Sequence, residues 1–458
     1  MKTRKEKKEF SSEYSLRNAL GKGSPLVWLS IPVWGLGSIA RRQIVKGLIF
    51  LAAEFLIIRF MILSGFQNLA KLVTLGEAEQ QKIWNEEKSI FEYVDGDRSL
   101  IILLYGIVTI AVLVAALLMI VLSVKNAYKA EALSKAGKKV PSIKEELENF
   151  FNGNLHFTLL SLPVLGTLAF TILPLIFMMS MAFTNYSKEG NKLVLFDWVG
   201  LDNFKQIVSF TGSLGQTFWS VLGWTVAWAV IATFLNYFFG MILAMVINWK
   251  EIRVKKFWRF CFVLTVAVPH FVTLLIIRQM LQPEGAVNVL LRSLGVIGAG
   301  ESLPFFTNTT WARTAVILIN LWVGAPYVLL QITGILQNIP QELYESAKVD
   351  GAGPVTTFRK ITLPYMLFVT TPYLITSFCG NVNNFNVIFL TSEGYPRAVE
   401  STAGKTDLLI TWLYKLTIEN QYFDIGAVIG IMTFITLGIA SLLTFRLSGS
   451  YKNEEGFR

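Results

Sequence analysis

Long apolar stretches alternate with short polar segments along the whole chain. Eight of these stretches are long enough to cross a bilayer as a helix, which takes about 20 residues. They cover residues 46–65, 99–124, 157–183, 217–248, 257–281, 314–337, 365–391 and 424–446. The pattern predicts an all-α polytopic membrane protein with about eight transmembrane helices.

A further apolar stretch, residues 25–40, is interrupted by Pro32, Gly35 and Gly37 and is shorter than a transmembrane helix. We expect it to be interfacial or re-entrant. Between the fifth and sixth spans, residues 282–313 contain Gly285 and Gly295, and we expect a short helix between these two glycines. With 53% hydrophobic and 16% charged residues, the composition also excludes a soluble globular protein of this length.

The charged residues divide between the polar segments by sign. Basic residues collect in 1–23, 125–156 and 249–256, whereas 66–98 is net acidic. Because cytoplasmic loops are enriched in Lys and Arg, both termini are expected in the cytoplasm. Membrane orientation thus explains the net charge of +10, and no nucleic-acid partner is expected. Residues 1–23 are expected to form a solvated tail that binds anionic membrane lipid at most weakly.

Two charges, Glu54 and Arg59, lie inside the first span. They are not four residues apart, so they do not face each other on one side of a helix. They could form a functional pair, but we favour snorkelling or contact with another helix, because a charge at the centre of a membrane is costly.

Catalytic and metal-binding chemistry is not indicated. Cys261 and Cys379 lie in separate apolar runs, and the only two histidines, His156 and His270, are far apart in the sequence. This arrangement favours neither a disulfide framework nor a metal site.

A nucleotide site is not indicated either. Gly404-Lys405-Thr406 is similar to the end of a phosphate-binding loop, but Val399 stands where that loop requires glycine. The spans also lack the series of Asp, Glu and His that a proton relay uses. The chain is therefore not expected to be an enzyme or to bind a cofactor.

One polar, motif-like segment, Glu342 to Pro364, separates the sixth and seventh spans. Pro340 suits the first turn of a short helix, and Gly351 can end that helix in a left-handed conformation. A second helix is expected to begin at Pro354 and to be broken by Pro364. This helix–turn–helix has the character of a docking surface.

The spacing within this segment resembles the EAA loop of permease subunits in binding-protein-dependent ABC importers. The match consists of Glu345-Ser346-Ala347, three residues, Gly351, nine residues and then Ile361-Thr362-Leu363-Pro364. It departs at Ser346, where the family usually has alanine. The resemblance implies that Glu345, Ser346, Ala347, Asp350 and Gly351 couple the chain to an ATPase on the cytoplasmic side.

The seventh span contains an unusual density of neutral polar residues. Ser377, Asn381 and Asn384 fall at i, i+4 and i+7 and so share one helical face, while Asn320, Gly324 and Tyr327 interrupt the sixth span. Amides and hydroxyls beside aromatic rings suit a sugar ligand. Hydrogen bonds between helices are the alternative explanation.

The run from Ser377 to Phe385, followed by Ala403-Gly404 and Thr406-Asp407-Leu408-Leu409, resembles the larger permease subunit of maltose and maltodextrin importers. That resemblance implies sugar contacts at Gly324, Tyr327, Ser377, Asn381 and Asn384. The family's enteric members have an aromatic residue where this chain has Gly380, which leaves the preferred sugar length open.

The resemblance also implies a domain organisation. It consists of a basic tail (1–23), an N-terminal region with two spans (24–150), a permease core (151–450) containing the coupling loop 338–364, and a second tail (451–458). The implied protein is a multi-pass bacterial cell-membrane permease for malto-oligosaccharides. Its partners would be a second permease subunit, two ABC ATPase subunits and an extracytoplasmic sugar-binding protein. The alternatives are a permease for raffinose-type sugars and a stand-alone secondary carrier.

Overall fold

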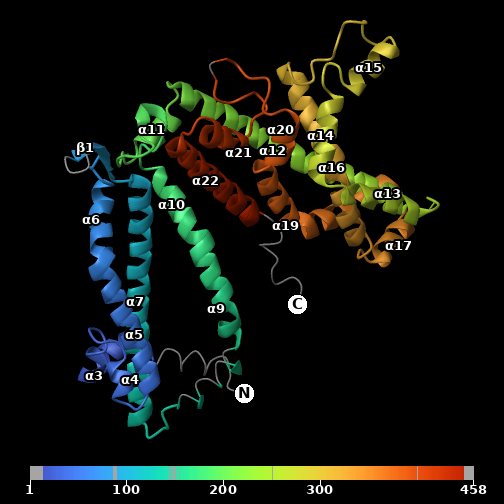
Figure 1. The fold of residues 1–458 in the computed structure, drawn as a ribbon. Coiled ribbons are helices and arrows are strands. Elements are labelled where there is room, and N and C mark those ends of the chain that lie inside the picture. The colour runs from blue at the N-terminus through green and yellow to red at the C-terminus, as the bar shows by residue number, and fades with distance from the viewer. Residues whose placement is uncertain are drawn as a thin grey trace. The chain divides into compact units, whose positions relative to one another are not determined.

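The computed structural model describes residues 14–85, 90–142, 144–145, 148, 151–153, 155–249, 251–399 and 401–447. The chain divides into two compact units, Met1–Gly200 and Leu201–Arg458, which are treated separately below (Figure 1). Most of the predicted basic tail and the whole of the tail 451–458 lie outside the described residues.

The first unit is built from long helices and one small hairpin. Its elements are α2 (Leu16–Lys22), α3 (Pro25–Trp28), α4 (Leu36–Ile39), α5 (Ile44–Phe60), the π-helical turn η1 (Met61–Gly65), α6 (Phe66–Thr74), β1 (Gln81–Asn85), β2 (Ile90–Val94), α7 (Ser99–Lys135), α9 (Leu155–Thr167), the π-helical turn η2 (Leu168–Ile172), α10 (Leu173–Met181) and the 3₁₀ turn η3 (Glu189–Asn191). Helices α6 and α7 pack side by side (Figure 1).

The three short helices near the N-terminus pack against α7. Ala19, Val27 and Ala127 are fully buried in one apolar cluster there. The described end of the predicted solvated tail is therefore a folded helix, α2, because it has an apolar surface of α7 to cover. Residues 25–40 form α3 and α4 with a turn between them, and neither helix is long enough to span a membrane.

A buried carboxylate joins these short helices to the end of α7. Glu131 is 4% exposed and accepts hydrogen bonds from the backbone and the hydroxyl of Ser24. Its carboxylate also forms ion pairs with Arg41, at 2.8 Å, and with Lys135, at 2.5 Å. We call Ser24, Arg41, Glu131 and Lys135 the charged cluster.

The two charges of the first span have different surroundings. The Glu54 carboxylate accepts a hydrogen bond from the backbone N–H of Trp34, in the turn before α4, at 2.7 Å. Glu54 is thus not paired with Arg59, and it contacts a turn where we expected snorkelling or contact with another helix. Arg59 lies on the exposed side of α5.

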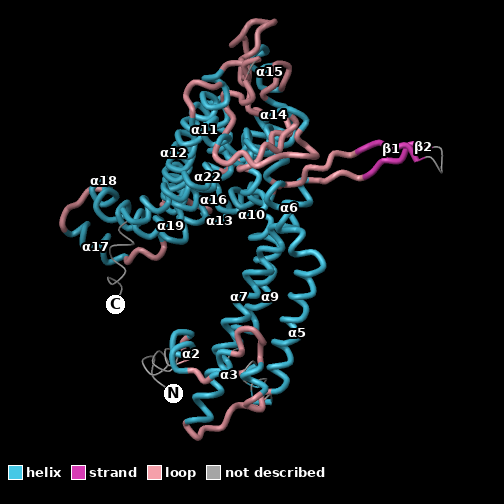
Figure 2. The backbone as a smooth tube through the Cα atoms, turned by 90° about the vertical axis from the view of Figure 1, so that its left-hand side faces the viewer, coloured by secondary structure: helices cyan, strands magenta, loops and turns pink. Residues whose placement is uncertain are grey.

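The acidic segment 66–98, which the sequence alone indicated only as a polar connection between spans, contains an antiparallel hairpin. Strand β1 pairs with β2 in the register Gln81↔Val94 (Figure 2). The Trp84 and Phe91 rings meet edge-on across the hairpin. Asp97 anchors the base of the hairpin by accepting hydrogen bonds from Lys71 and from the backbone N–H groups of Glu77 and Ala78. The hydrogen bond from Lys71, followed by that from Ala78, holds the pKa of Asp97 below its ordinary value.

The second unit contains the remaining helices. They are α11 (Asp202–Val208), α12 (Ser213–Asn248), α13 (Lys255–Ala267), α14 (His270–Met280), α15 (Ala286–Ser293), α16 (Thr309–Leu336), α17 (Gln341–Val349), α18 (Pro354–Thr357), the π-helical turn η4 (Phe358–Thr362), α19 (Leu363–Val382), α20 (Phe385–Thr391), α21 (Leu409–Tyr414), the π-helical turn η5 (Lys415–Glu419) and α22 (Phe423–Leu447). Helix α15 occupies the place expected for a short helix between Gly285 and Gly295.

Helices α12, α16 and α19 form the core of this unit. Helix α12 presents small buried residues to α16, including Ala229, Ala232, Gly240 and Ala244. A Cβ atom at Gly240 would lie 2.7 Å from Val328, so glycine is needed for the two helices to approach this closely.

The described residues confirm the expected number of spans. Seven helical segments are long and apolar enough to cross a membrane: Ile44–Thr74, Ser99–Lys135, Leu155–Met181, Ser213–Asn248, Thr309–Leu336, Pro354–Thr391 and Phe423–Arg446. The pair α13 and α14 makes an eighth, bent by 88°. The expectation of an unbroken helix over 257–281 is wrong, because Pro269 lacks an N–H and Val268 before it is extended, with ψ of 129°.

Candidate functional site

The seventh span is interrupted deep inside the second unit. Helix α19 ends at Val382 and α20 begins at Phe385, with Asn384 accepting a hydrogen bond from the N–H of Val387 as the cap of α20. Helix α14, which follows the bend at Pro269, packs against α20. Broken helices of this kind place exposed helix ends inside a membrane protein, where such ends commonly bind substrates.

Two of the predicted sugar ligands lie at this break. Asn381 is 8% exposed, and its side-chain amide donates to the hydroxyl of Thr233 at 2.9 Å. The amide of Asn384 donates to the side-chain carbonyl of Asn320 at 3.1 Å. Each amide therefore already bonds a neighbouring helix, as the interhelical alternative describes, and sugar contact by either residue stays a prediction.

The other residues of the seventh-span face are less enclosed. Ser377 is half-buried and lies one turn after Tyr373 in α19. Gly380 is exposed, and nothing lies within 4 Å of a Cβ atom placed on it. The family's enteric members have an aromatic residue at this position, and the space next to Gly380 is open in this chain.

The two predicted residues of the sixth span lie in different surroundings. A Cβ atom at Gly324 would be 2.5 Å from the side-chain nitrogen of Asn236 on α12. Tyr327, 48% exposed, instead lines a cavity of about 130 Å³ together with His270 and Trp322, beside the bend at Pro269. Of the five predicted sugar ligands, Tyr327 is the one that lines this cavity.

The fourth span contributes polar side chains to this site that were not predicted from the sequence. Trp228, Thr233 and Asn236 of α12 are all buried against the other two core helices. Thr233 bonds Asn381, the indole N–H of Trp228 bonds the backbone carbonyl of Asn381, and Asn236 contacts Gly324. Thr and Asn at 233 and 236, three residues apart in an otherwise apolar span, are the signal that could have revealed this face.

The polar segment between the sixth and seventh spans forms the expected helix–turn–helix. Helix α17 begins one residue after Pro340, and Gly351 has the predicted left-handed conformation, with φ of 73°. Glu345 and Ser346, like Asp350 and Gly351, are exposed, while Ala347 is half-buried. These positions suit contact with another protein, but their coupling role stays a prediction.

Pro364 does not break the second helix, contrary to expectation. The chain begins α18 at Pro354, as predicted, and then continues through η4 into α19 without interruption. In the π-helical turn η4, backbone N–H groups bond carbonyls five residues earlier instead of four. The helix can therefore continue although Pro364 has no N–H to donate. The second half of this polar segment, from Pro354 onward, and Asn381 consequently belong to one continuous helix.

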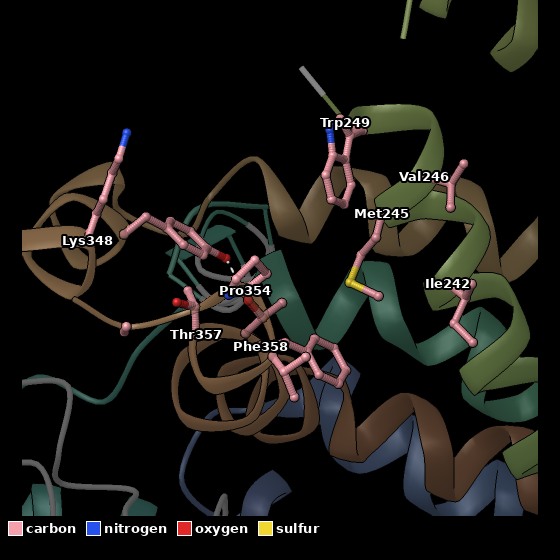
Figure 3. A pocket seen from close by; sticks show the side chains of 12 residues that line it. Ile242, Met245, Val246, Trp249, Lys348, Pro354, Thr357 and Phe358 are labelled. Atoms are coloured by element: carbon pink, nitrogen blue, oxygen red, sulfur yellow. Dashed lines mark hydrogen bonds between the residues drawn. The ribbon is translucent and has the colours of Figure 1, made fainter. Parts of the chain in front are cut away.

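A groove lies between the helix–turn–helix of α17 and α18 and the C-terminal end of α12. It has a volume of about 700 Å³, and Met245 and Trp249 lie on one side of it with Pro354 and Phe358 on the other (Figure 3). Across its floor, the hydroxyls of Tyr344 and Thr362 are 3.0 Å apart and tie α17 to η4. This bond fixes how α17 is presented at the end of the long helix.

Comparison with known proteins places this architecture in a family. Residues 236–449 match the family described as "Binding-protein-dependent transport system inner membrane component". The chain is 36% identical to the maltodextrin transport system permease protein MdxF of Bacillus subtilis, over 92% of this chain and 95% of that protein. The chain belongs to the carbohydrate ABC importer permeases.

Two further comparisons limit what the similarity to MdxF shows about this chain. The permease is 34% identical to the galactooligosaccharides transport system permease protein GanP of Bacillus subtilis, over 92% of this chain and 96% of that protein. It also shares its fold, with a TM-score of 0.54 and 22% identity over 66% of this chain and 97% of the other, with a chain of a bacterial ABC transporter for alginate. It is a multi-pass membrane permease subunit, whose ATPase is a separate subunit.

Proposed function

We propose that this permease imports malto-oligosaccharides by alternating access, driven by ATP that partner subunits hydrolyse. The likeness to MdxF supports the substrate class. GanP is nearly as similar, so galacto-oligosaccharide import is the second candidate. The complete importer would contain a second permease subunit, two ABC ATPase subunits and an extracytoplasmic sugar-binding protein, with both termini of this chain in the cytoplasm.

The observation that carries the proposal is the cluster of amides at the break between α19 and α20. Asn381 and Asn384 supply donors and acceptors for sugar hydroxyls, and both lie where a span is interrupted inside the protein. Neutral amides suit an uncharged ligand, because they can exchange a helix partner for a hydroxyl without leaving a buried charge.

The coupling route follows from the continuous helix. It runs from Pro354, beside the exposed coupling residues, to Val382, next to Asn381. At 1.5 Å per residue this is a rod of about 40 Å. A displacement of α17 by a closing ATPase would pass through the Tyr344–Thr362 contact into this rod and move the amides at its far end.

The test is uptake by the intact complex, purified with its partners and placed in lipid vesicles. Labelled maltotriose should accumulate only with ATP, and unlabelled maltodextrins should compete better than galacto-oligosaccharides or raffinose. Stronger competition by galacto-oligosaccharides would favour the second candidate. Accumulation without ATP would contradict the mechanism.

A further inference from the structure

We infer that Thr233 and Trp228 of α12 are positioning residues for Asn381, and that they hold its side chain and its backbone in place for contact with the sugar. This inference rests on the proposed function, since it assumes that Asn381 contacts the transported carbohydrate.

Asn381 is held by α12 at two atoms. Its side-chain nitrogen donates to Thr233 Oγ1 at 2.9 Å, and its backbone oxygen accepts from Trp228 Nε1 at 3.0 Å. Thr233 is 3% exposed and Trp228 is fully buried, so water does not compete for either bond. Together the two bonds fix both the backbone and the side chain of Asn381.

The backbone around Asn381 needs such support because the helix ends there. The N–H of Phe385, the α-helical partner for the Asn381 carbonyl, bonds Asn383 instead, at 2.8 Å. The carbonyl accepts from Asn384 N at 3.2 Å, a 3₁₀-type bond, and from the Trp228 indole. Trp228 thus stabilises the geometry of the break on the side facing α12.

The Thr233 contact also fixes where the Asn381 amide lies. With its nitrogen on Thr233, the amide keeps its oxygen, Oδ1, for a further partner, and that oxygen can accept a hydrogen bond from a sugar hydroxyl. Without a hydroxyl at residue 233, the side chain of Asn381 loses this attachment to α12.

The experiment measures sugar molecules imported per ATP hydrolysed, by the full complex in vesicles. Thr233→Val keeps the side-chain shape and removes the acceptor, so Asn381 should release the sugar before closure completes. Loss of one neutral hydrogen bond corresponds to about a tenfold change in an equilibrium, so the sugar-to-ATP ratio should fall about five- to tenfold. The maximal ATPase rate should stay within twofold of the unmodified complex.

Two variants serve as controls. Thr233→Ser keeps the acceptor and should retain the ratio within twofold. Thr433→Val removes another buried hydroxyl, on α22, which donates to the carbonyl of Ile429 in its own helix at 2.7 Å, and should leave the ratio unchanged. If Thr233→Val assembles poorly, Trp228→Phe, which removes the indole donor to Asn381 together with one ring of the side chain, should still lower the ratio by at least threefold.

The outcomes separate the inference from the proposed function. A lowered ratio in Thr233→Val that Thr233→Ser restores supports the positioning role. An unchanged ratio in Thr233→Val, or a parallel loss of ATPase activity and uptake, overturns it if Asn381→Ala itself lowers the ratio. An unchanged ratio in Asn381→Ala removes Asn381 from the sugar site and thereby refutes the underlying assignment.

Discussion

The charged cluster of the first unit and the amides of the second both join helices through buried polar groups. In the first, the carboxylate of Glu131 takes two cations and two bonds from Ser24. In the second, Asn381 and Asn384 make single neutral bonds to Thr233 and Asn320. Removing one partner from a buried ion pair costs about 3–5 kcal/mol, whereas a neutral hydrogen bond contributes about 0.5–1.5 kcal/mol.

This difference in free energy suggests two roles for buried polar groups: the charged cluster holds helices together permanently, whereas a neutral hydrogen bond can be exchanged for another. The charged cluster is too costly to open during a transport cycle, so it suits a permanent connection between α7 and the short N-terminal helices. The neutral bond between Asn384 and Asn320 can be exchanged for a bond to a sugar hydroxyl at little cost. Four predictions probe this distinction.

The largest functional effect is expected at an exposed charge that belongs to neither region. Glu345→Lys should abolish sugar-stimulated ATP hydrolysis, because it reverses the charge on the surface proposed to meet the ATPase. Insertion of the permease into the membrane should be unaffected. Glu342→Lys, the same charge change at an exposed residue of the same helix, is the matched control for ATPase assays. Unchanged coupling in Glu345→Lys would remove the docking role.

The largest effect on stability is expected in the charged cluster. Glu131→Ala leaves Arg41, whose side chain is 12% exposed, without its carboxylate, and should destabilise the packing of α2–α4 on α7 by about 3–5 kcal/mol. Limited proteolysis in vesicles should then cut within residues 14–41. Glu145→Ala breaks an exposed pair with Lys139 and should change nothing. Equal protease resistance of the Glu131 and Glu145 variants would show that the cluster does not hold these helices.

A smaller effect is expected where α12 and α16 approach most closely beside the amides. Gly324→Ala places a methyl group 2.5 Å from the Asn236 amide, and overpacking of this kind costs about 1–3 kcal/mol. The thermal unfolding midpoint of the complex should fall. Gly334→Ala, at a position in the same helix with nothing within 4 Å, should leave it unchanged. A normal midpoint for Gly324→Ala would mean that Asn236 moves freely.

The smallest effect concerns the pH response of the hairpin base. The pKa of Asp97 is lowered in the folded protein, so its contribution to stability is present above the ordinary aspartate pKa and is lost as the pH falls through the lowered value. Once the intrinsic pH dependence of amide exchange is divided out, the protection of the Glu77 and Ala78 amides should therefore persist from neutral pH into the mildly acidic range and fall only below it. Asp97→Asn, which removes the charge paired with Lys71, should lower this protection at neutral pH. Protection that is already lost near neutral pH would contradict the lowered pKa.

Hydropathy was sufficient to place the spans, because each one must be apolar over the thickness of a bilayer. The turn at Gly351 was also predictable, since few residues tolerate its positive φ. The continuation of the helix through Pro364 and the 88° bend at Pro269 were not distinguishable in sequence. Both involve proline, and only tertiary packing decides whether a π-helical turn absorbs it or the helix bends.

The site was only partly predictable for a similar reason. Asn381 and Asn384 stand out because lipid does not tolerate amides. Their partners Thr233 and Asn320 lie 148 and 64 residues away, on helices whose mutual rotation no local pattern specifies. Helix α2 was missed because the apolar surface that it covers belongs to α7.

The most direct test of the account is paired measurement of uptake and ATPase activity for the complex carrying both Asn381→Ala and Asn384→Ala. The account predicts that the ATPase subunits remain bound and are still stimulated by the sugar-loaded binding protein, while malto-oligosaccharide uptake falls at least tenfold. Uptake at the unmodified rate with both asparagines replaced would show that these amides only join helices, and would contradict the proposed sugar site.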